Sequence, residues 1–456
     1  MPFSQIPSRL GQIGSTEVWI SHRFASARTY LFGLVALCVG LTYLYRTGGF
    51  VDGFDSAANQ SSLRDYGVWV RAGQNLWAGI DPYAADGILK SGVFASQIIF
   101  LTYNIFPNPL YFFLAMQLLN LAGLLFFMWQ NKLLRVEFTF VAYAMLTFSS
   151  TREILVNGQT TGLIMGVFAI LQKFLVHTGS FDKSGIRESL LKTSTNIACG
   201  IGIFFILDLK PNIGFFPILI LLIIFRKSSA FLFGIVMWGL DLVIFSVKTE
   251  SNLIASWAIN LSKVTNFEDN ANLFGSLGFW QIVNELALPS LAIEILPVGT
   301  FIFVGILAIS LARNNNYESA LFLAFLSNYF YSYFHFYSYF PILAFILIRL
   351  IRNNSVFLLG VVISSMEFSF NENVQVTSVA SLLLLVLIII FFRFETTTQT
   401  LNFTFGWCLA IIFKALLSFQ FGLSSLECRS LIILVPTLAY SMSLVKARTS
   451  IRKLGR

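Results

Sequence analysis

The chain has 456 residues, of which 56% are hydrophobic and only 11% are charged. Because a soluble protein carries about 25% charged residues, this composition excludes an ordinary soluble fold. The formal net charge is +8, but the basic residues stand in short stretches between apolar segments, where they indicate membrane topology rather than nucleic-acid binding.

Apolar segments of membrane length recur from residue 29 to residue 445. Backbone polar groups in lipid must pair internally, so the sequence predicts an all-α, polytopic helical membrane protein with about 11–14 transmembrane helices. We expect residues 1–28 to form a cytoplasmic segment and residues 29–445 a single transmembrane domain. Residues 446–456 form a basic cytoplasmic tail, which we expect to contact anionic lipid headgroups. The first apolar segment is predicted to be an uncleaved span, since no small-residue cleavage site follows it.

The first outer interval, residues 46–93, contains the stretch on which the functional argument depends. Asp65 falls in the first turn of a predicted amphipathic helix, where the helix dipole favours the ionised carboxylate. Gly79 and Asp81-Pro82 are predicted to end this helix. Tyr and Trp on the apolar face favour a position at the water–lipid boundary. The apolar face recurs at steps of three and four residues: Tyr66, Trp69, Val70, Gly73, Leu76 and Trp77.

The later apolar segments predict the remaining spans in chain order. With a cytoplasmic N-terminus, alternation places most Lys and Arg on the cytoplasmic side and most acids on the other. A second long outer interval, residues 248–289, lies on the same side as the first. The segments, beginning with the first span, are 29–45, 109–130, 136–150, 159–176, 195–208, 212–225, 229–247, 290–312, 318–334, 338–350, 355–368, 376–393, 403–421 and 430–445, with 94–106 a possible half-span.

Four polar features stand out on the outer side, because charged or amide groups near a bilayer are costly. They are Asp65, Asn157-Gly158-Gln159, Asp208-Leu209-Lys210-Pro211 and the aromatic stretch Tyr331–Pro341 around His335. Each alone has a simple structural interpretation: a helix cap, a turn, a local charge pair and an interfacial aromatic belt, respectively. Two nearby acids, Asp52 and Asp55, are alternatives to Asp65 as the functional carboxylate of this interval.

The topology brings all four features to one face of the membrane, and their chemistry is complementary. A carboxylate can accept a proton from a hydroxyl nucleophile. Lysine or histidine can stabilise a phosphate leaving group as its negative charge grows. Aromatic rings can stack on sugars or line the path of a prenyl chain.

In these residues the chain resembles the polyprenol-phosphate-mannose-dependent mannosyltransferases, glycosyltransferase family 87 of the GT-C superfamily. The resemblance begins with Asp65, its helix and Gly79-Ile80-Asp81-Pro82-Tyr83, and continues through Gly158-Gln159 and Lys210-Pro211. It ends with Asn272-Leu273-Phe274-Gly275-Ser276 and with Ser332-Tyr333-Phe334-His335-Phe336-Tyr337, which Pro341 follows. One departure is Ser91-Gly92-Val93, which stands where the family has a Tyr-Pro-Pro-like turn.

The resemblance implies a GT-C fold in the plasma or inner membrane, with the active site on the extracytoplasmic side. The donor would be a sugar, plausibly mannose, on a polyprenyl phosphate, and the acceptor a lipid or a glycan. Asp65 would deprotonate the acceptor hydroxyl, and the sugar would be transferred with inversion. The resemblance also implies roles for other residues: catalysis by His335, phosphate binding by Lys210, His335 and Arg64, and substrate binding by Gln159, Asn157, Tyr83, Asn272 and Tyr337.

Two other classes of function stay open at this point. A multi-pass transporter or lipid flippase would use the intramembrane residues Asp241 and Lys414, which otherwise form a satisfied pair or mark a misplaced span boundary. A non-catalytic membrane scaffold is the third possibility. The four cysteines have no metal-ligand spacing, so we expect no metal site, disulfide framework or cofactor.

Overall fold

The structure of the protein is a computed structural model. The described residues are 20–22, 64–86, 92–106, 109–130, 154, 159–178, 186–225, 228–265, 289–313, 317–331, 339–352, 354–365, 374–423, 428, 431–433 and 436. The first predicted span at 29–45, the segment at 136–150 and the basic tail therefore lie outside the description.

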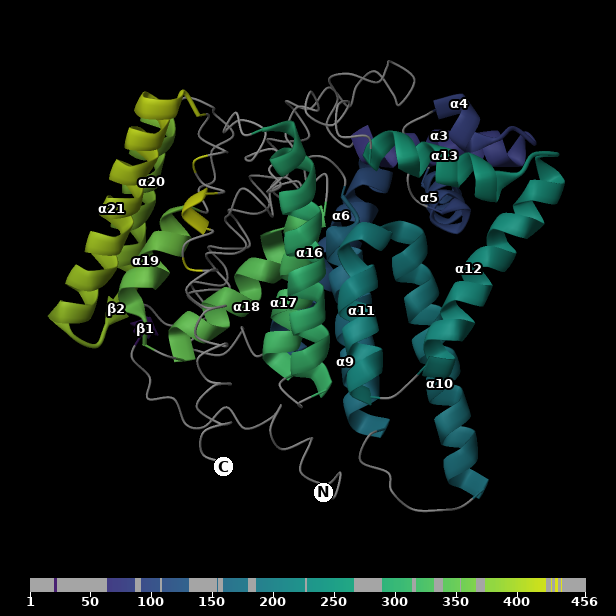
Figure 1. Cartoon of the computed structure of the whole chain (residues 1–456), viewed down its shortest axis with the longest axis horizontal. Coiled ribbons are helices and arrows are strands. Elements are labelled where there is room, and N and C mark those ends of the chain that lie inside the picture. The colour runs from purple at the N-terminus through teal and green to yellow at the C-terminus, as the bar shows by residue number, and fades with distance from the viewer. Residues whose placement is uncertain are drawn as a thin grey trace.

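Helices dominate these residues, with one small exception. β1 (Ile20–His22) and β2 (Phe392–Phe394) form a short antiparallel ladder in which Ser21 lies opposite Arg393. The helices, shown in Figure 1, are α3 (Arg64–Trp77), α4 (Pro82–Asp86), α5 (Val93–Ile105), α6 (Pro109–Gln130), α9 (Thr161–Thr178), α10 (Ile186–Leu209), α11 (Pro211–Phe225), α12 (Ser228–Lys248), α13 (Leu253–Thr265), α16 (Ser290–Arg313), α17 (Tyr317–Tyr331), α18 (Tyr339–Arg352), α19 (Val356–Ser364), α20 (Val374–Phe391) and α21 (Thr397–Phe421).

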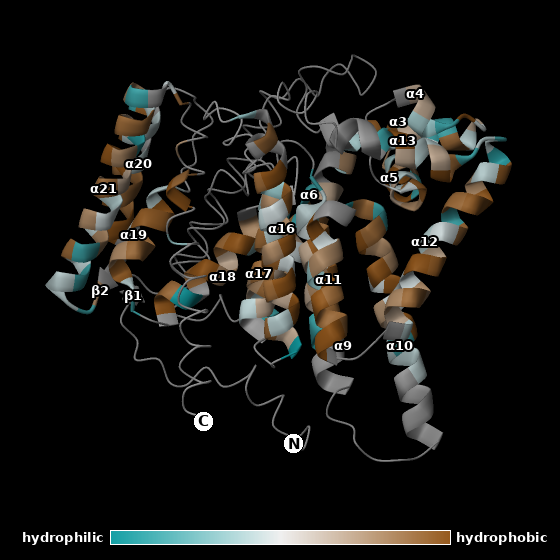
Figure 2. Cartoon of the chain, viewed as in Figure 1, coloured by the Kyte–Doolittle hydropathy of each residue, from teal (hydrophilic) through white to brown (hydrophobic). Residues whose placement is uncertain are grey.

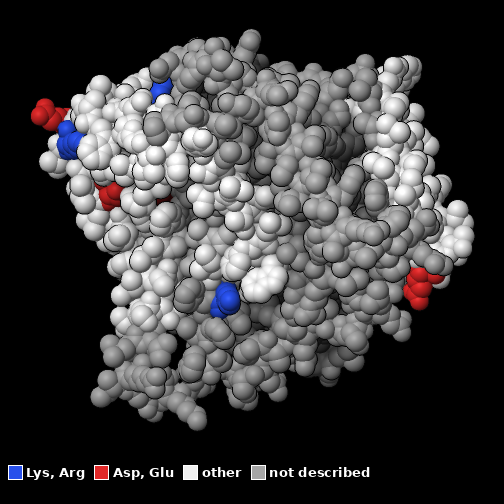
Figure 3. All heavy atoms as spheres, turned by 180° about the vertical axis from the view of Figure 1, so that it is seen from behind, with Lys and Arg blue, Asp and Glu red and all other residues white. Residues whose placement is uncertain are grey.

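Three described helices are long and apolar enough to cross a bilayer: Ser229–Lys248, Ile295–Arg313 and Thr397–Gln420. A 20-residue helix is about 30 Å long, which matches the hydrocarbon core. Most positions along these helices are hydrophobic (Figure 2), and Phe419 is 89% exposed. On the face seen in Figure 3, the charged side chains of the described residues are few and isolated. The prediction of an all-α membrane protein is confirmed at this level, while the number of spans and the GT-C arrangement stay predictions.

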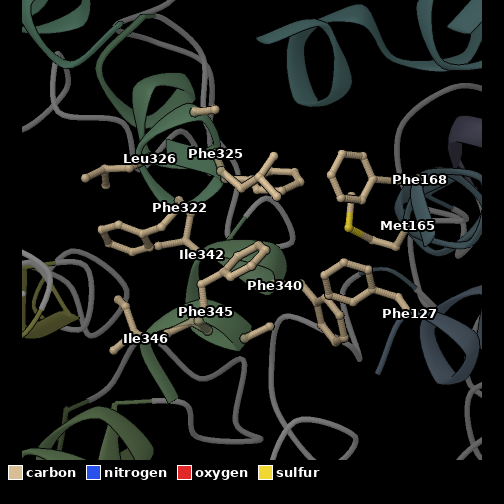
Figure 4. Packing of buried hydrophobic residues seen from close by; sticks show 14 of the residues in the cluster. Phe127, Met165, Phe168, Phe322, Phe325, Leu326, Phe340, Ile342, Phe345 and Ile346 are labelled. Carbon is tan, nitrogen blue, oxygen red and sulfur yellow. The ribbon is translucent and has the colours of Figure 1, made fainter. Parts of the chain in front are cut away.

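The interior is packed with aromatic side chains from helices that are distant in sequence. Phe127 of α6 and Phe168 of α9 face Phe325 of α17 and Phe345 of α18 (Figure 4). The rings of Phe325 and Phe345 stack with centroids 5.7 Å apart, and Phe168 meets Phe325 edge-on at 5.3 Å. Much of the phenylalanine content is thus used for packing between helices.

Helices α6 and α9 approach so closely that their backbones touch. A Cβ atom added at Gly166 would lie 2.8 Å from the Cα of Gly123, and one added at Gly123 would overlap the carbonyl of Gly162. Gly162 and Gly166 are four residues apart, the spacing that lets two membrane helices pack through their backbones. This crossing fixes where α9 begins relative to α6.

The predicted amphipathic helix is present as α3, and Gly79 ends it in the left-handed conformation (φ +76°). Its aromatic residues do not share one environment, which corrects the expected interfacial position. Tyr66 and Trp69 are buried in the protein, and the Tyr66 ring lies 6.0 Å from that of Phe112 on α6. Trp77 is 55% exposed and lies under the ammonium group of Lys248, 4.2 Å from its ring centroid.

The two long intervals at residues 46–93 and 248–289 pack directly against each other. Asp81 caps α4 through its Oδ1, which accepts the N–H of Tyr83 at 2.9 Å, and its Oδ2 accepts the hydroxyl of Ser256 on α13 at 2.6 Å. The amide of Asn260, also on α13, donates to the main-chain oxygen of Tyr83 at 3.2 Å. In Figure 1, α3, α4, α5 and α13 accordingly gather at the end of α12 that carries Lys248.

Candidate functional site

The corner between α10 and α11 holds the first candidate residues. Pro211 is the first residue of α11, where its missing N–H has no cost, and Lys210 occupies the turn before it. The ammonium group of Lys210 donates a hydrogen bond to Oε1 of Gln159, which precedes α9 and is 51 residues away in sequence. A residue predicted to bind the donor phosphate and one predicted to bind substrate are therefore neighbours in space.

Asn120 of α6 fixes the position of Gln159. Its Nδ2 donates to the main-chain oxygen of Gln159, and its Oδ1 accepts the N–H of Leu163 at 3.1 Å. Asn120 is fully buried, so both bonds lie in a medium where unpaired polar groups are costly. The side chain caps α9 from a neighbouring helix and holds the backbone of Gln159, the residue that Lys210 contacts.

Asp208 is turned toward a different helix from Lys210. Its Oδ2 accepts the N–H of Ala95, and its main-chain oxygen accepts the N–H of Gly92 at 2.7 Å. The carboxylate thus caps the N-terminus of α5, where the helix dipole favours negative charge. Its Oδ1 packs on Gly92 so closely that no Cβ atom fits there. The spacing of Asp208 and Lys210 allows a local charge pair. In the structure, Asp208 instead bonds to the start of α5, and Lys210 bonds to Gln159.

A second carboxylate lies beside the first. Asp241 of α12 also accepts the N–H of Phe94, and it is close enough to Asp208 for the two charges to repel. Tyr83 completes this acidic cluster (Tyr83, Asp208 and Asp241) from α4, with its side chain only 2% exposed. Burial raises the pKa of the Tyr83 phenol well above its ordinary value, and the carboxylates of Asp208, Asp241 and Asp81 raise it further.

This cluster predicts a loss of stability in alkali. In the unfolded chain Tyr83 ionises near the ordinary tyrosine pKa of 10.0, whereas the folded phenol stays neutral, so above pH 10 the unfolded state binds fewer protons and is favoured. The free energy of unfolding should fall by up to about 1.4 kcal/mol per pH unit from this residue. Thermal unfolding of the wild type and Tyr83→Phe between pH 8 and pH 11.5 tests this: the difference between the two should change above pH 10 and not below it. A difference that is constant across the whole range would contradict the assignment.

The other predicted site residues are placed only in part. Arg64 and Asp65 lie in the first turn of α3, as expected, and their side chains are outside the description. Asn157, Asn272, His335 and Tyr337 lie outside the described residues, so their roles stay predictions.

The start of α3 can be placed along α6. Tyr66 packs on Phe112 in the first turn of α6, whereas Asn120, which holds Gln159, lies eight residues further on (112 to 120). That separation corresponds to about 12 Å along the helix axis. The helix that contains Asp65 in its first turn therefore lies nearer the N-terminal end of α6 than the contact between Lys210 and Gln159 does.

The structure adds residues that the sequence did not single out for the site. Asn120 lies within an apolar segment, where no sequence pattern indicates a role for it. Thr160 and Thr161 are residue types that are common at the start of any helix. Asp241 was recognised as an intramembrane acid, but its neighbour could not be inferred from spacing. An Asp241–Lys414 pair is not formed: α12 and α21 lie at opposite sides of the molecule (Figure 1), and Lys414 donates to Thr377 at 2.9 Å.

Comparison with known proteins provides no assignment. No protein-family model matches the chain, and neither a curated protein nor a solved structure is significantly similar to it. The arrangement of Lys210, Gln159 and Asn120, together with the motifs in the sequence, is therefore the basis for any functional conclusion.

Proposed function

We propose that the protein is a membrane glycosyltransferase of the GT-C type, which transfers a sugar from a polyprenyl phosphate to a lipid or glycan acceptor on the extracytoplasmic side. Mannose is the sugar that the sequence motifs favour. The observation that carries the proposal is the contact between Lys210 and Gln159. It joins the Lys-Pro and Gly-Gln motifs, which are separate in the sequence and belong to one donor site in this hypothesis.

The position of Lys210 supports a role with an anionic lipid. Placing an ammonium group at the junction of two apolar helices costs free energy, so such a group usually has a bonding partner or a function. Lys210 is half-buried, so its charge is partly desolvated and remains accessible. A phosphate on a prenyl chain matches both properties, since its apolar chain partitions into the bilayer and its negative charge pairs with lysine.

The reaction can be written with Asp65 as the general base. The carboxylate of Asp65 takes the proton of an acceptor hydroxyl, and the hydroxyl oxygen attacks the anomeric carbon. A glycosidic bond forms as the bond between that carbon and the phosphate oxygen breaks, and the electron pair leaves with the polyprenyl phosphate. Lys210, with His335 and Arg64 as predicted partners, would stabilise the charge that grows on the phosphate.

We expect Lys210→Gln to lower kcat for sugar transfer by about 10²-fold, because the ammonium group stabilises the leaving phosphate. The assay uses the full-length protein in detergent, a radiolabelled polyprenyl-phosphate mannose and a lipid extract as acceptor. Lys248→Gln is the matched control, since Lys248 contacts Trp77 at the outer end of α12, and it should keep wild-type activity. Lys210→Arg should retain part of the activity because it keeps the charge. Wild-type turnover in Lys210→Gln, or transfer from a nucleotide sugar without a lipid carrier, would overturn the proposal.

A transporter or lipid flippase is the second candidate, and one observation favours it. Asp208 and Asp241 lie side by side between apolar helices, and paired intramembrane acids often carry protons or ions. Both carboxylates are nevertheless bonded to the N-terminus of α5, which is a structural role. We therefore rank this candidate second.

A further inference from the structure

We propose that the N-terminus of α9, with the hydroxyl groups of Thr160 and Thr161 and the ammonium group of Lys210, binds a phosphate group. Its assignment to the phosphodiester of a polyprenyl-linked donor rests on the proposed function, whereas the phosphate site itself does not. Nothing in the sequence motifs assigns Thr160 or Thr161 a role.

The two threonine hydroxyls are the first observation. Both side chains are 0% exposed, and neither Oγ1 atom has a hydrogen-bond partner among the described residues. A buried hydroxyl without a partner costs about 1–3 kcal/mol, and two adjacent ones at the same helix end need an explanation. An oxyanion that accepts a hydrogen bond from each would supply it.

The second observation is the backbone of the same helix end. The N–H of Leu163 is taken by Asn120, and that of Ile164 bonds to the oxygen of Thr160 at 3.0 Å. This end of the 18-residue helix is the positive end of its dipole, which favours a bound anion.

Lys210 supplies the charge. Its ammonium group is held at Gln159 Oε1, one residue before Thr160, so it lies next to the helix end. Asn120 keeps the helix end in place from α6. The two threonine hydroxyls and the ammonium group of Lys210 therefore belong to the same helix end.

This set of donors fits a phosphate better than a carboxylate. A carboxylate presents two oxygens in one plane, whereas the oxygens of a phosphate point in several directions and can meet donors from two helices. The single lysine and the helix dipole together match the one negative charge of a phosphodiester. The corner adjoins apolar helices, where the prenyl chain of a lipid-linked phosphate can lie.

The test measures binding by the full-length protein in a phosphate-free maltoside detergent. Inorganic phosphate and a polyprenyl phosphate are titrated separately, and binding is followed by tryptophan fluorescence and by the shift in unfolding temperature. Thr160→Val and Thr161→Val remove each hydroxyl with little change in volume. Each should raise Kd for the polyprenyl phosphate about tenfold, the loss of one hydrogen bond to a charged group. Thr300→Val, whose hydroxyl bonds to Leu296 in α16 at 2.6 Å, is the control and should bind as the wild type does.

The readouts separate this inference from a structural role and from the proposed enzyme activity. Without ligand, both variants should unfold at or above the wild-type temperature, because the hydroxyls that they lose have no protein partner among the described residues. Wild-type affinity for both ligands in both variants would overturn the inference, even if sugar transfer is observed. Threonine-dependent binding of polyprenyl phosphate without any transfer would support the site and count against the enzyme. Threonine-dependent binding of inorganic phosphate alone would keep the phosphate site and exclude a lipid-linked ligand.

Discussion

An Asp65→Asn variant should lose sugar transfer by about 10³-fold, the largest catalytic effect that we expect in this protein. The amide keeps the shape of the carboxylate and can no longer take the proton of the acceptor hydroxyl, a contribution worth about 10²–10⁴-fold in general-base catalysis. The loss should appear in kcat, since in our proposal the donor phosphate is bound elsewhere, at the end of α9. Initial rates with labelled polyprenyl-phosphate sugar at saturating donor measure it directly.

The matched control is Asp86→Asn, which removes a carboxylate from the same outer interval at the end of α4. It should transfer sugar at the wild-type rate, and both variants should unfold at the wild-type temperature. Equal activity in Asp65→Asn and wild type would remove Asp65 as the base. If both proteins instead move a lipid substrate across a vesicle membrane and neither transfers sugar, the transporter becomes the better assignment.

Gly92→Ala should destabilise the protein by about 3 kcal/mol. The added Cβ atom would overlap the carboxylate of Asp208, which must then leave Ala95 and the N-terminus of α5. Displacing a buried, hydrogen-bonded carboxyl group costs about 1–3 kcal/mol, and overpacking costs a further 1–3. Gly92 has ordinary extended backbone angles (φ −71°, ψ 175°), so the effect is one of space rather than of conformation. Unfolding temperatures in detergent measure it.

Gly239→Ala is the control, because the space around Gly239 in α12 is open and alanine favours a helix. It should be neutral or slightly stabilising. In Gly92→Ala combined with Asp208→Ala, the loss should be smaller than the sum of the two single losses, since the clash disappears with the carboxylate. Equal unfolding temperatures for Gly92→Ala and Gly239→Ala would show that Asp208 does not pack on α5.

Hydropathy alone placed most of the described helices. The predicted segments 109–130, 229–247 and 376–393 correspond closely to α6, α12 and α20, since an apolar run of that length has few alternatives to a helix in a bilayer. The start of α10 was missed because hydropathy marks the apolar part of a helix, whereas α10 extends back to Ile186 through a polar turn. The β1–β2 ladder joins segments about 370 residues apart (22 to 392), and no local pattern indicates such a pairing.

The site was predictable in its residue types and less so in its contacts. Charge patterning orders whole loops and so predicts Lys210 and Gln159 on one side of the membrane; that side stays a prediction. That Lys210 contacts Gln159 rather than Asp208 depends on how α9 and α10 are rotated about their axes. Packing of Gly162 and Gly166 against α6 sets the rotation of α9. Likewise, Ser91-Gly92-Val93 stood out only as a departure from the family pattern. The structure supplies a reason for glycine there, since the carboxylate of Asp208 occupies the space that a side chain would need.

The glycine crossing of α6 and α9 limits how this protein can move. In transport by alternating access, whole bundles rock against each other around a central site. Where two helices meet through backbone atoms, as at Gly123 and Gly162, no layer of side chains can change rotamer to absorb such rocking. Helices α6 and α9 must therefore travel as one rigid body, and any gate in this protein has to open somewhere else.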